Sequence, residues 1–406
     1  MIVKEMKTIW FVSQYAGGPG VGMQYRQYQL AKELNQQGHQ AMVISGSFSH
    51  LYRNPPTVQR NGERQRLEGV DFVWVKNPRY EKSISMGRFW NMLVFAWNIL
   101  RLDVRSFPKP DAVVVSSPSM LPIVAALKWK RRFKCKVFFE VRDIWPLTLQ
   151  ELGNLSRFHP LVMFMRYFEC LAYRKSDLVI SLLPNASKHY EKGGMPASNF
   201  RYLPNGVESE LTDVPSTFHW PSSIAPSDFV VGYGGSIGKA NALRYLMEAA
   251  QLLKDEKNIH FVCVGKGDQL DALKQQASGL SNVHFLPPVE KREFLSMLKK
   301  FRLCYIGLER ESLFRFGVSP NKLFDYMLAK RPVLYAIDSG NKPVYEATCG
   351  WSVEAGNPQH IAGAIREAAQ TSKSELDRLG ENGYRFVMEN HTYAHLAKRL
   401  VAFIEE

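Results

Sequence analysis

The 406-residue sequence contains no apolar run that approaches the roughly 20 residues a membrane-spanning helix needs, so we expect no transmembrane segment. Its N-terminus lacks the charged, apolar and small-residue regions of a secretory signal, and we therefore expect a cytoplasmic protein. The five cysteines form no CxxC pair, which predicts free thiols and argues against a zinc site. Sequence repeats are absent, which excludes a solenoid.

Length and charge are informative. A chain of 406 residues is too long for one ordinary core, which predicts two domains. Residues 1–205 hold 29 Lys and Arg against 14 Asp and Glu, a net charge of +15, whereas residues 206–406 carry −1. A basic half favours nucleic acid, an anionic membrane surface or a phosphate-bearing substrate as partner, although solubility alone is a simpler explanation.

Strand-like and helical segments alternate along the chain. The first unit is a buried strand at 8–13, a glycine cluster, a helix that ends at Gly38 and a second strand at 41–44. The alternation continues to residue 205 and restarts after a Pro- and Ser-rich stretch at 206–228. This pattern predicts an α/β protein with two doubly wound parallel sheets.

Segment 86–102, "MGRFWNMLVFAWNILRL", is densely apolar and is flanked by arginines. Its apolar core, residues 89–100, is too short to span a bilayer. The segment fits a helix in the membrane interface, with its aromatic rings at headgroup depth and its arginines on lipid phosphates. It fits a buried amphipathic helix of the first domain equally well.

Two glycine-rich turns in the second half have the position of a ligand site, because open parallel sheets bind ligands beyond the carboxyl ends of their strands. "YGGSIGKAN" places Gly235 and Lys239 between a strand and a helix, and "VGKGDQLDAL" does the same with Gly265 and Gly267. Glycines let the backbone approach an anion, and a helix N-terminus favours it. Any strand-to-helix turn can also be glycine-rich for local reasons.

A third turn, "FRFGVSPNKLFDYMLAKRPVL", is more specific. Ser319 and Pro320 precede a helix that we expect to begin at Asn321, and both are also ordinary helix-start residues. The turn offers free amides, Lys322 and Asp325 to one ligand volume. We therefore predict a diphosphate held by amides and lysine, with Asp325 on sugar or ribose hydroxyls.

With "EVRDIWP", "YLPNGVE" and "GVSPNKLFDYMLAKRPVL", the sequence resembles the retaining glycosyltransferases of family 4 over nearly its whole length. Within them it is similar to bacterial O-antigen and capsule enzymes such as L-N-acetylfucosamine transferases. The resemblance implies the GT-B fold, with two Rossmann-like domains facing across a cleft. Residues 1–205 would bind the acceptor, 206–228 would be the linker and 229–390 would bind the donor, with a C-terminal helix at about 391–406 packed back on the first domain.

The resemblance also assigns donor contacts residue by residue. It implies contacts to the diphosphate, the base and the ribose of a nucleotide sugar. These are Gly17, Gly18, Gly20, Gly235, Lys239, Ser319, Pro320 and Asn321 for the diphosphate, Gly265 and Gly267 for the base, and Asp325, the second acid of a Glu-x7-Glu signature, for the ribose.

The sequence departs from the family pattern at several of these positions. The first acid of the signature falls on Gly317, and the usual Arg and Lys of the first donor-domain loop fall on Ser236 and Asn241. The family's histidine is replaced within "EVRDIWP", which leaves Arg142 and Asp143 as polar candidates. We therefore expect the catalytic groups, which neutralise the leaving diphosphate or face the acceptor, to be Arg142, Asp143, Lys239 and Lys322.

Retaining transfer without an obvious nucleophile would proceed by departure of the diphosphate and same-face attack of the acceptor hydroxyl. We expect no metal, because lysines, arginine and helix N-termini supply positive charge and no DxD pair ends a strand. We expect no cofactor beyond the nucleotide-sugar donor, with UDP favoured. The acceptor would be an undecaprenyl-diphosphate-linked glycan at the inner face of the cytoplasmic membrane, where the basic domain would contact anionic lipid.

Two alternatives remain open from the sequence. A basic half also suits a nucleic-acid-binding protein, but no recognised nucleic-acid motif is present, so we expect no nucleic-acid partner. Another enzyme of the same fold, such as a sugar-phosphate epimerase or a glycogen-synthase-like enzyme, is the second alternative, because fold does not imply function.

Overall fold

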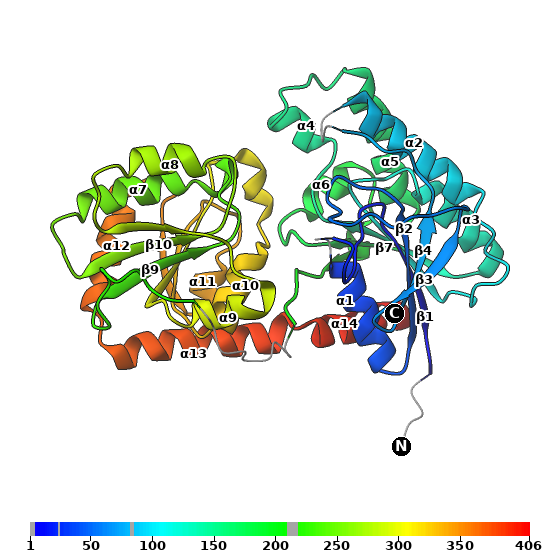
Figure 1. The fold of residues 1–406 in the computed structure, drawn as a ribbon. Coiled ribbons are helices and arrows are strands. Elements are labelled where there is room, and N and C mark those ends of the chain that lie inside the picture. The colour runs from blue at the N-terminus through cyan, green and yellow to red at the C-terminus, as the bar shows by residue number, and fades with distance from the viewer. Residues whose placement is uncertain (1–4, 23–24, 82–84, 209–217) are drawn as a thin grey trace. The chain divides into compact units, whose positions relative to one another are not determined.

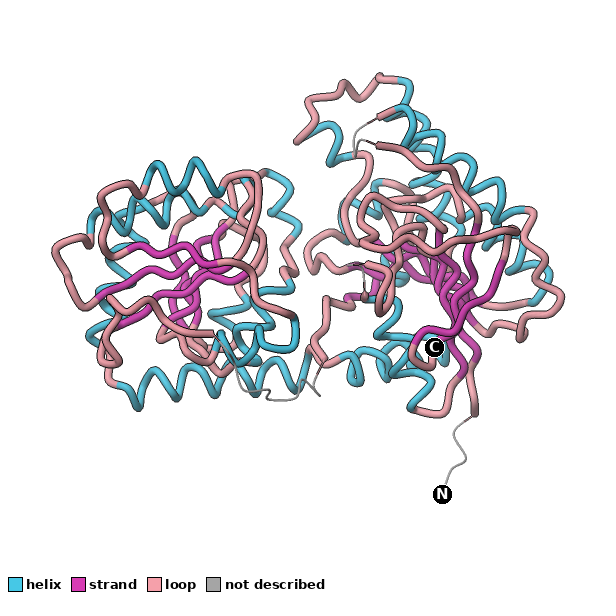
Figure 2. Tube along the Cα trace, in the orientation of Figure 1, coloured by secondary structure: helices cyan, strands magenta, loops and turns pink. Residues whose placement is uncertain are grey.

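The computed structural model describes residues 5–22, 25–81, 85–208 and 218–406. The chain forms two compact units, residues 1–205 with 393–406 and residues 206–392. Each unit is built on its own sheet with helices on both faces (Figures 1 and 2). Two parallel-sheet α/β domains, the predicted fold class, are thereby confirmed.

The first unit contains an eight-stranded sheet in the order β3-β4-β2-β1-β5-β6-β7-β8, counted over its described residues. All neighbours pair in parallel except β3 with β4. Because chain connections diverge on either side of β1 and β5, the topological switch point lies between these two strands. The strands are β1 (Thr8–Val12), β2 (Gln40–Gly46), β3 (Glu63–Leu67), β4 (Val70–Val75), β5 (Ala112–Ser116), β6 (Lys136–Val141), β7 (Leu178–Ser181) and β8 (Phe200–Tyr202).

Alternate residues of β1 show how the two faces of this sheet are covered. Phe11 packs in a core with α1 and α14, whereas Trp10 contacts Trp129 of α3 edge to face. This period of two is what a strand buried on both faces requires. The helices are α1 (Arg26–Gln36), α2 (Met86–Leu100), α3 (Ile123–Phe133), α4 (Leu147–Glu151), α5 (Pro160–Lys175), α6 (Ser187–Lys192), the short 3-10 helix η1 (Ala197–Asn199) and α14 (Tyr393–Glu405).

The second unit has a six-stranded, all-parallel sheet in the order β11-β10-β9-β12-β13-β14 over its described residues. Its switch point lies between β9 and β12. The strands are β9 (Phe229–Gly234), β10 (Ile259–Val264), β11 (Val283–Leu286), β12 (Leu303–Gly307), β13 (Val333–Ala336) and β14 (Gly350–Val353). The helices are η2 (Lys239–Asn241), α7 (Leu243–Leu252), α8 (Leu270–Gln276), α9 (Lys291–Leu298), η3 (Ser312–Phe316), α10 (Asn321–Leu328), α11 (Pro343–Glu346), α12 (Pro358–Gln370) and α13 (Lys373–Asn390).

The expected linker at 206–228 and the apolar segment at 86–102 can now be located in the structure. Of the predicted linker 206–228, residues 209–217 lie outside the described part, and Phe218 and Ile224 pack into the core of the second unit. Segment 86–102 forms α2, which buries Phe95 and Ile99 and exposes other aromatic side chains. Over the described residues, no helix combines the length and apolarity needed to cross a membrane.

Candidate functional site

The two glycine turns of the second unit are packed against each other at the carboxyl edge of its sheet. Gly235 follows β9, and Gly265 follows β10 with φ at +156°. A Cβ on Gly265 would overlap the carbonyl oxygen of Gly235, and one on Gly267 would overlap the carbonyl oxygen of Ile237. The Ile237 amide donates to the Lys266 carbonyl at 2.9 Å. Glycine is therefore required here because two backbones meet.

Lys322, in the first turn of α10, reaches the same place. Its side chain passes so close to Gly235 that a Cβ there would overlap the lysine Cε. The ammonium donates to Asn241 Oδ1 at 2.6 Å and lies 5.2 Å from the centre of the Tyr233 ring. Burial lowers the pKa of Lys322 to about 8, although Asp325 acts in the opposite direction. A half-buried cation thus lies where the carboxyl end of β9 meets the N-terminal end of α10.

The loop that precedes α10 is fixed by two hydrogen bonds between Val318 and the side chain of Asn341. Asn341 accepts from the Val318 amide at 2.8 Å and donates to the Val318 carbonyl at 3.0 Å. Pro320 stands at the cap position and provides no side-chain cap, and the Leu323 amide donates to the Pro320 carbonyl at 3.1 Å. The positive end of the α10 dipole still favours an anion at this position. The Tyr326 hydroxyl accepts from the Gly234 amide at 3.1 Å and ties α10 to β9.

The structure thus brings several of the predicted donor residues together at this switch point. The residues that converge through the contacts above are Gly235, Gly265, Gly267 and Lys322. Asn321 begins α10 beside Lys322, Ser319 and Pro320 precede it in the adjoining loop, and Asp325 lies one turn further along the helix. Lys239 lies in η2 with an exposed side chain, two residues before Asn241. Contact of any of these residues with a donor stays a prediction.

Two of the three candidate glycines of the first unit, Gly17 and Gly18, are explained by close packing. A Cβ on Gly18 would crowd Leu67 and Phe72 at 3.2 Å, and one on Gly17 would meet the backbone of Gly22 at the same distance. Gly20 is exposed, with φ at +78° and no atom within 4 Å of an added Cβ. Their predicted approach to a donor diphosphate stays a prediction.

Arg142 and Asp143 follow β6 at the carboxyl edge of the first sheet. The Ser117 hydroxyl accepts from the Arg142 amide at 2.9 Å and donates to the Asp143 carbonyl at 3.4 Å, which fixes their backbone to the end of β5. The Asp143 side chain is exposed and that of Arg142 is half-buried. Their side chains are therefore accessible to a ligand at this edge.

A buried ionic network beneath these residues was not predicted. Arg26 and Glu140, both 2% exposed, pair at 2.8 Å between Nε and Oε1. Ser116 and Gln27 donate to Glu140 Oε2 at 2.8 and 3.1 Å, and Arg26 donates to the Leu203 carbonyl at 3.0 Å. Burial alone would raise the pKa of Glu140, but the charges of Arg26 and Arg142 and the hydrogen bonds lower it overall.

The network joins α1, β5, β6 and the segment after β8, and so fixes the carboxyl edge of the first sheet. The available sequence signal was a charge inside an apolar strand, the glutamate of "KVFFEV". Within the described ranges, no three His, Cys, Asp or Glu side chains are grouped so that they could hold a metal ion.

Each half of the chain matches a known family. Residues 21–206 match the family described as "Glycosyl transferase 4-like domain", and residues 228–371 match "Glycosyl transferases group 1". The chain consists of two glycosyltransferase domains. The O-antigen and capsule subgroup within this class stays a prediction.

Two curated relatives of this glycosyltransferase have names that propose the same activity. WbjE of Pseudomonas aeruginosa, named as a glycosyltransferase, is 24% identical over 91% of this chain and 92% of its own length. WcaI of Escherichia coli K12, whose name proposes a glycosyl transferase of colanic acid biosynthesis, is 23% identical over 73% of this chain and 74% of its own.

Solved structures share the fold. Sucrose-phosphate synthase from Thermosynechococcus elongatus superimposes with a TM-score of 0.73 at 14% identity, covering 98% of each chain. Anabaena HepE, solved with UDP and glucose, gives 0.65 at 15% identity, covering 98% of this chain and 99% of its own. WaaG, described as involved in lipopolysaccharide biosynthesis, gives 0.64 at 15% identity over 98% and 99%. The glycosyltransferase therefore has the GT-B type of fold.

Proposed function

We propose that this glycosyltransferase transfers a sugar, with retention of configuration, from a UDP-sugar to a lipid-linked oligosaccharide during synthesis of a bacterial surface polysaccharide such as O-antigen or capsule. The observation that carries the proposal is the convergence of the Gly235 and Gly265 turns, Lys322 and the start of α10 at one switch point. The names of WcaI and WaaG support the polysaccharide context, and the UDP complex of HepE supports the nucleotide.

The donor site has the chemistry that a sugar diphosphate needs. The N-terminal end of the α10 dipole and the Lys322 ammonium supply positive charge beside backbone that only glycines can form. The leaving diphosphate gains negative charge as the glycosidic bond breaks, and fixed donors stabilise that charge most in a partly desolvated site. Lys239 adds a second cation, and Asp325 takes ribose hydroxyls. We propose that no metal is required, because these groups carry the charge.

The acceptor belongs, in this proposal, to the first domain. Arg142 and Asp143 lie accessible at the carboxyl edge of its sheet, on backbone fixed by Ser117 and by the buried Arg26–Glu140 pair. A rigid platform of this kind supports orientation of an acceptor hydroxyl, which is the main contribution open to a retaining enzyme without a nucleophile.

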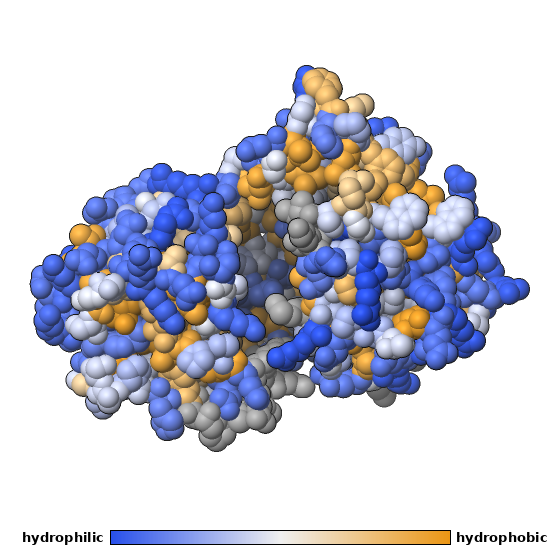
Figure 3. All heavy atoms as spheres, turned by 45° about the horizontal axis from the view of Figure 1, so that its top comes forward, coloured by the Kyte–Doolittle hydropathy of each residue, from blue (hydrophilic) through white to orange (hydrophobic). Residues whose placement is uncertain are grey.

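One face of the first domain suits an anionic membrane surface. Apolar side chains gather there over α2 and the neighbouring segment with α4 (Figure 3). Trp90 and Trp97 of α2 are 60% and 55% exposed, and Arg101 stacks on Trp97 at 4.5 Å. The helix α3, which packs against α2, ends in the basic residues Lys130, Arg131 and Arg132. We propose peripheral docking of this face on the inner leaflet of the cytoplasmic membrane.

Titration of the purified protein with UDP, GDP and ADP in EDTA tests the donor assignment. We expect UDP to bind and to stabilise the protein, by about 2.7 kcal/mol at a hundredfold excess over Kd, and GDP and ADP to bind more weakly. A preference for another base would refute UDP. A requirement for added Mg²⁺ or Mn²⁺ would refute metal independence, and no nucleotide binding at all would refute the donor site.

A further inference from the structure

A cluster of cations lies in the second domain at the amino edge of its sheet, opposite the glycine turns. A cavity of about 440 Å³ opens there, and seven of its 12 lining residues are charged. These are Asp228, Lys299, Lys300, Arg302, Arg331, Lys373 and Asp377. Five cations thus face two acids, although the second half of the chain carries a net charge of −1.

Two arginines of this amino-edge cavity occupy neighbouring positions on one face of the sheet. Cys304 of β12 pairs with Val333 of β13, and Arg302 and Arg331 each stand two residues earlier. Because side chains two residues apart along a strand point to the same face, the two guanidinium groups project to the same side. Burial lowers the pKa of Arg331, and the like charge of Arg302 acts in the same direction.

Helix α13 brings a lysine to the same place. It packs so closely on the loop before β13 that a Cβ on Gly380 would overlap the Lys330 carbonyl oxygen, and Lys330 pairs with Glu381 at 2.8 Å. Asp377 and Lys373 lie one and two turns before Gly380, and both line the cavity. A lysine of α13 therefore joins the two arginines of the sheet edge.

These three cations lack an acid partner. Over the described residues, no ion pair or side-chain hydrogen bond engages Arg302, Arg331 or Lys373, and Nε of Arg331 is buried without a partner. The carboxylate of Asp228 lies 3.1 Å from His260 Nε2. Other arginines of this domain each pair with a carboxylate, namely Arg244, Arg310, Arg366 and Arg378. A partly buried guanidinium without a partner is unfavourable, so the cavity favours an anion.

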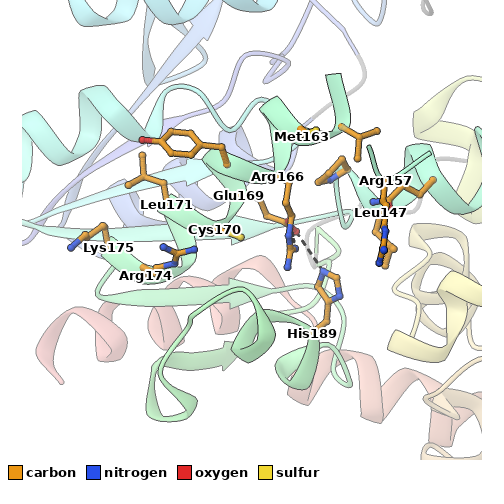
Figure 4. A pocket seen from close by; sticks show the side chains of 14 residues that line it. Leu147, Arg157, Met163, Arg166, Glu169, Cys170, Leu171, Arg174, Lys175 and His189 are labelled. Carbon is orange, nitrogen blue, oxygen red and sulfur yellow. Dashed lines mark hydrogen bonds and ion pairs between the residues drawn. The ribbon is translucent and has the colours of Figure 1, made fainter. Parts of the chain in front are cut away.

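The larger cavity of the first domain, about 770 Å³ along α5, has a different arrangement (Figure 4). Arg157 and Lys175 lie at its opposite ends. Arg166 of α5 is paired with Glu169 at 2.5 Å. Its cations are therefore too dispersed to bind one anion together.

We propose that the amino-edge cavity binds a phosphate monoester, with the dianionic phosphate between Arg302, Arg331 and Lys373. A guanidinium donates two parallel hydrogen bonds to phosphate oxygens, and three cations suit a dianion better than a diester with a single charge. The lining is mostly charged, which favours a small hydroxylated body over a hydrocarbon one, and Asp377 accepts from its hydroxyls. The site is separate from the predicted donor site, which lies at the carboxyl edge of the same sheet.

The test titrates the full chain with glycerol 3-phosphate in a calorimeter. We expect glycerol and dimethyl phosphate, a diester, each to bind at least about tenfold more weakly. The double variant R302Q/R331Q should raise the Kd for glycerol 3-phosphate roughly a hundredfold, since each lost charge-assisted contact costs about tenfold. Arg378→Gln is the matched control and should leave the Kd unchanged, because this arginine of α13 pairs with Glu375 and does not line the cavity.

Thermal unfolding of every variant separates loss of the site from loss of the fold. Because the burial of Arg331 is unfavourable, R302Q/R331Q should unfold at or above the native Tm. Lys373→Gln changes an exposed residue at the start of α13 and should raise the Kd about tenfold, which keeps the test valid even if the double variant fails to fold. Lys322→Met should bind glycerol 3-phosphate as the native chain does.

Four outcomes would overturn the proposal. Two of them are no binding of glycerol 3-phosphate by the native chain and equal affinity in the native chain and R302Q/R331Q. Competition between glycerol 3-phosphate and UDP would place the phosphate in the donor site. Binding to phosphatidylglycerol vesicles that is lost in R302Q/R331Q, without binding of glycerol 3-phosphate, would make the cavity a phospholipid site.

Discussion

Replacement of Lys322 by methionine should stabilise the free protein and weaken nucleotide binding at the same time. The lysine ammonium is half-buried between Asn241 and the Tyr233 ring, and burial lowers its pKa from 10.5 to about 8. Methionine keeps most of the apolar stem beside Gly235 and removes the charge. A buried charge that lowers the stability of a protein is commonly kept because it binds a ligand. The replacement of Lys322 should therefore raise the stability of the free protein and lower its affinity for the nucleotide.

The size of the effect follows from the pKa. A shift from 10.5 to about 8 corresponds to at most about 3 kcal/mol of unfavourable desolvation. Partial solvent access and the lost hydrogen bond to Asn241 reduce the expected gain to about 1 kcal/mol, or about 2–4 °C in Tm for a domain of this size. Loss of one charge-assisted contact to the diphosphate should raise the Kd for UDP roughly ten- to hundredfold.

The dependence on pH has a definite sign. Because the folded pKa of Lys322 is depressed, its penalty is complete below pH 8 and disappears as the pH rises towards 10.5. The Tm gap between K322M and the native protein should therefore shrink over that range. UDP needs the charged lysine, so its affinity should be constant below about pH 8 and fall above it, by at most tenfold per pH unit. K322M should show no such fall.

Calorimetric titration with UDP from pH 7 to 9.5, together with thermal unfolding, measures both effects. Lys254→Met serves as the matched control, because Lys254 is an exposed lysine after α7 at the opposite edge of the sheet. An unchanged Kd in K322M would show that Lys322 does not contact the diphosphate. A lower Tm would show that its burial is not unfavourable.

Three further predictions test the framework of each domain. Glu140→Gln should cost about 3–5 kcal/mol in unfolding free energy by leaving Arg26 buried without a counter-ion. The Tm gap should begin to narrow below pH 4.5, where Glu140 of the unfolded chain takes up a proton, and should close only when the pH passes the lowered pKa of the native carboxyl; an unchanged Tm would contradict this. Gly265→Ala should cost more than about 3 kcal/mol and abolish UDP binding, whereas Gly279→Ala, at φ +84° in open space, should cost only about 1 kcal/mol. The double variant of Trp90 and Trp97 to serine should bind phosphatidylglycerol vesicles about tenfold more weakly with unchanged Tm and UDP affinity; unfolding of this variant would instead assign both side chains to the core.

Local patterns were sufficient for most of the second domain. Gly235 and Gly265 follow strands and Asn321 begins a helix, as the sequence pattern predicts. Glycine and proline change the conformation of the backbone at their own positions, so their effect can be predicted from the local sequence. The polar strand β3, "ERQRL", was not among the predicted strands. It pairs antiparallel with β4 at the sheet edge, where solvent covers one side and the apolar pattern disappears.

The sequence by itself determined the α/β class, the division of charge between the halves and the position of each candidate turn, because these depend on residue type and short-range period. Only the tertiary structure decided which turns meet. The contact between the Gly235 and Gly265 loops and the reach of Lys322 to Asn241 depend on the order of β10, β9 and β12 in the sheet. Strand order is set by pairing between distant segments, and no local period encodes it.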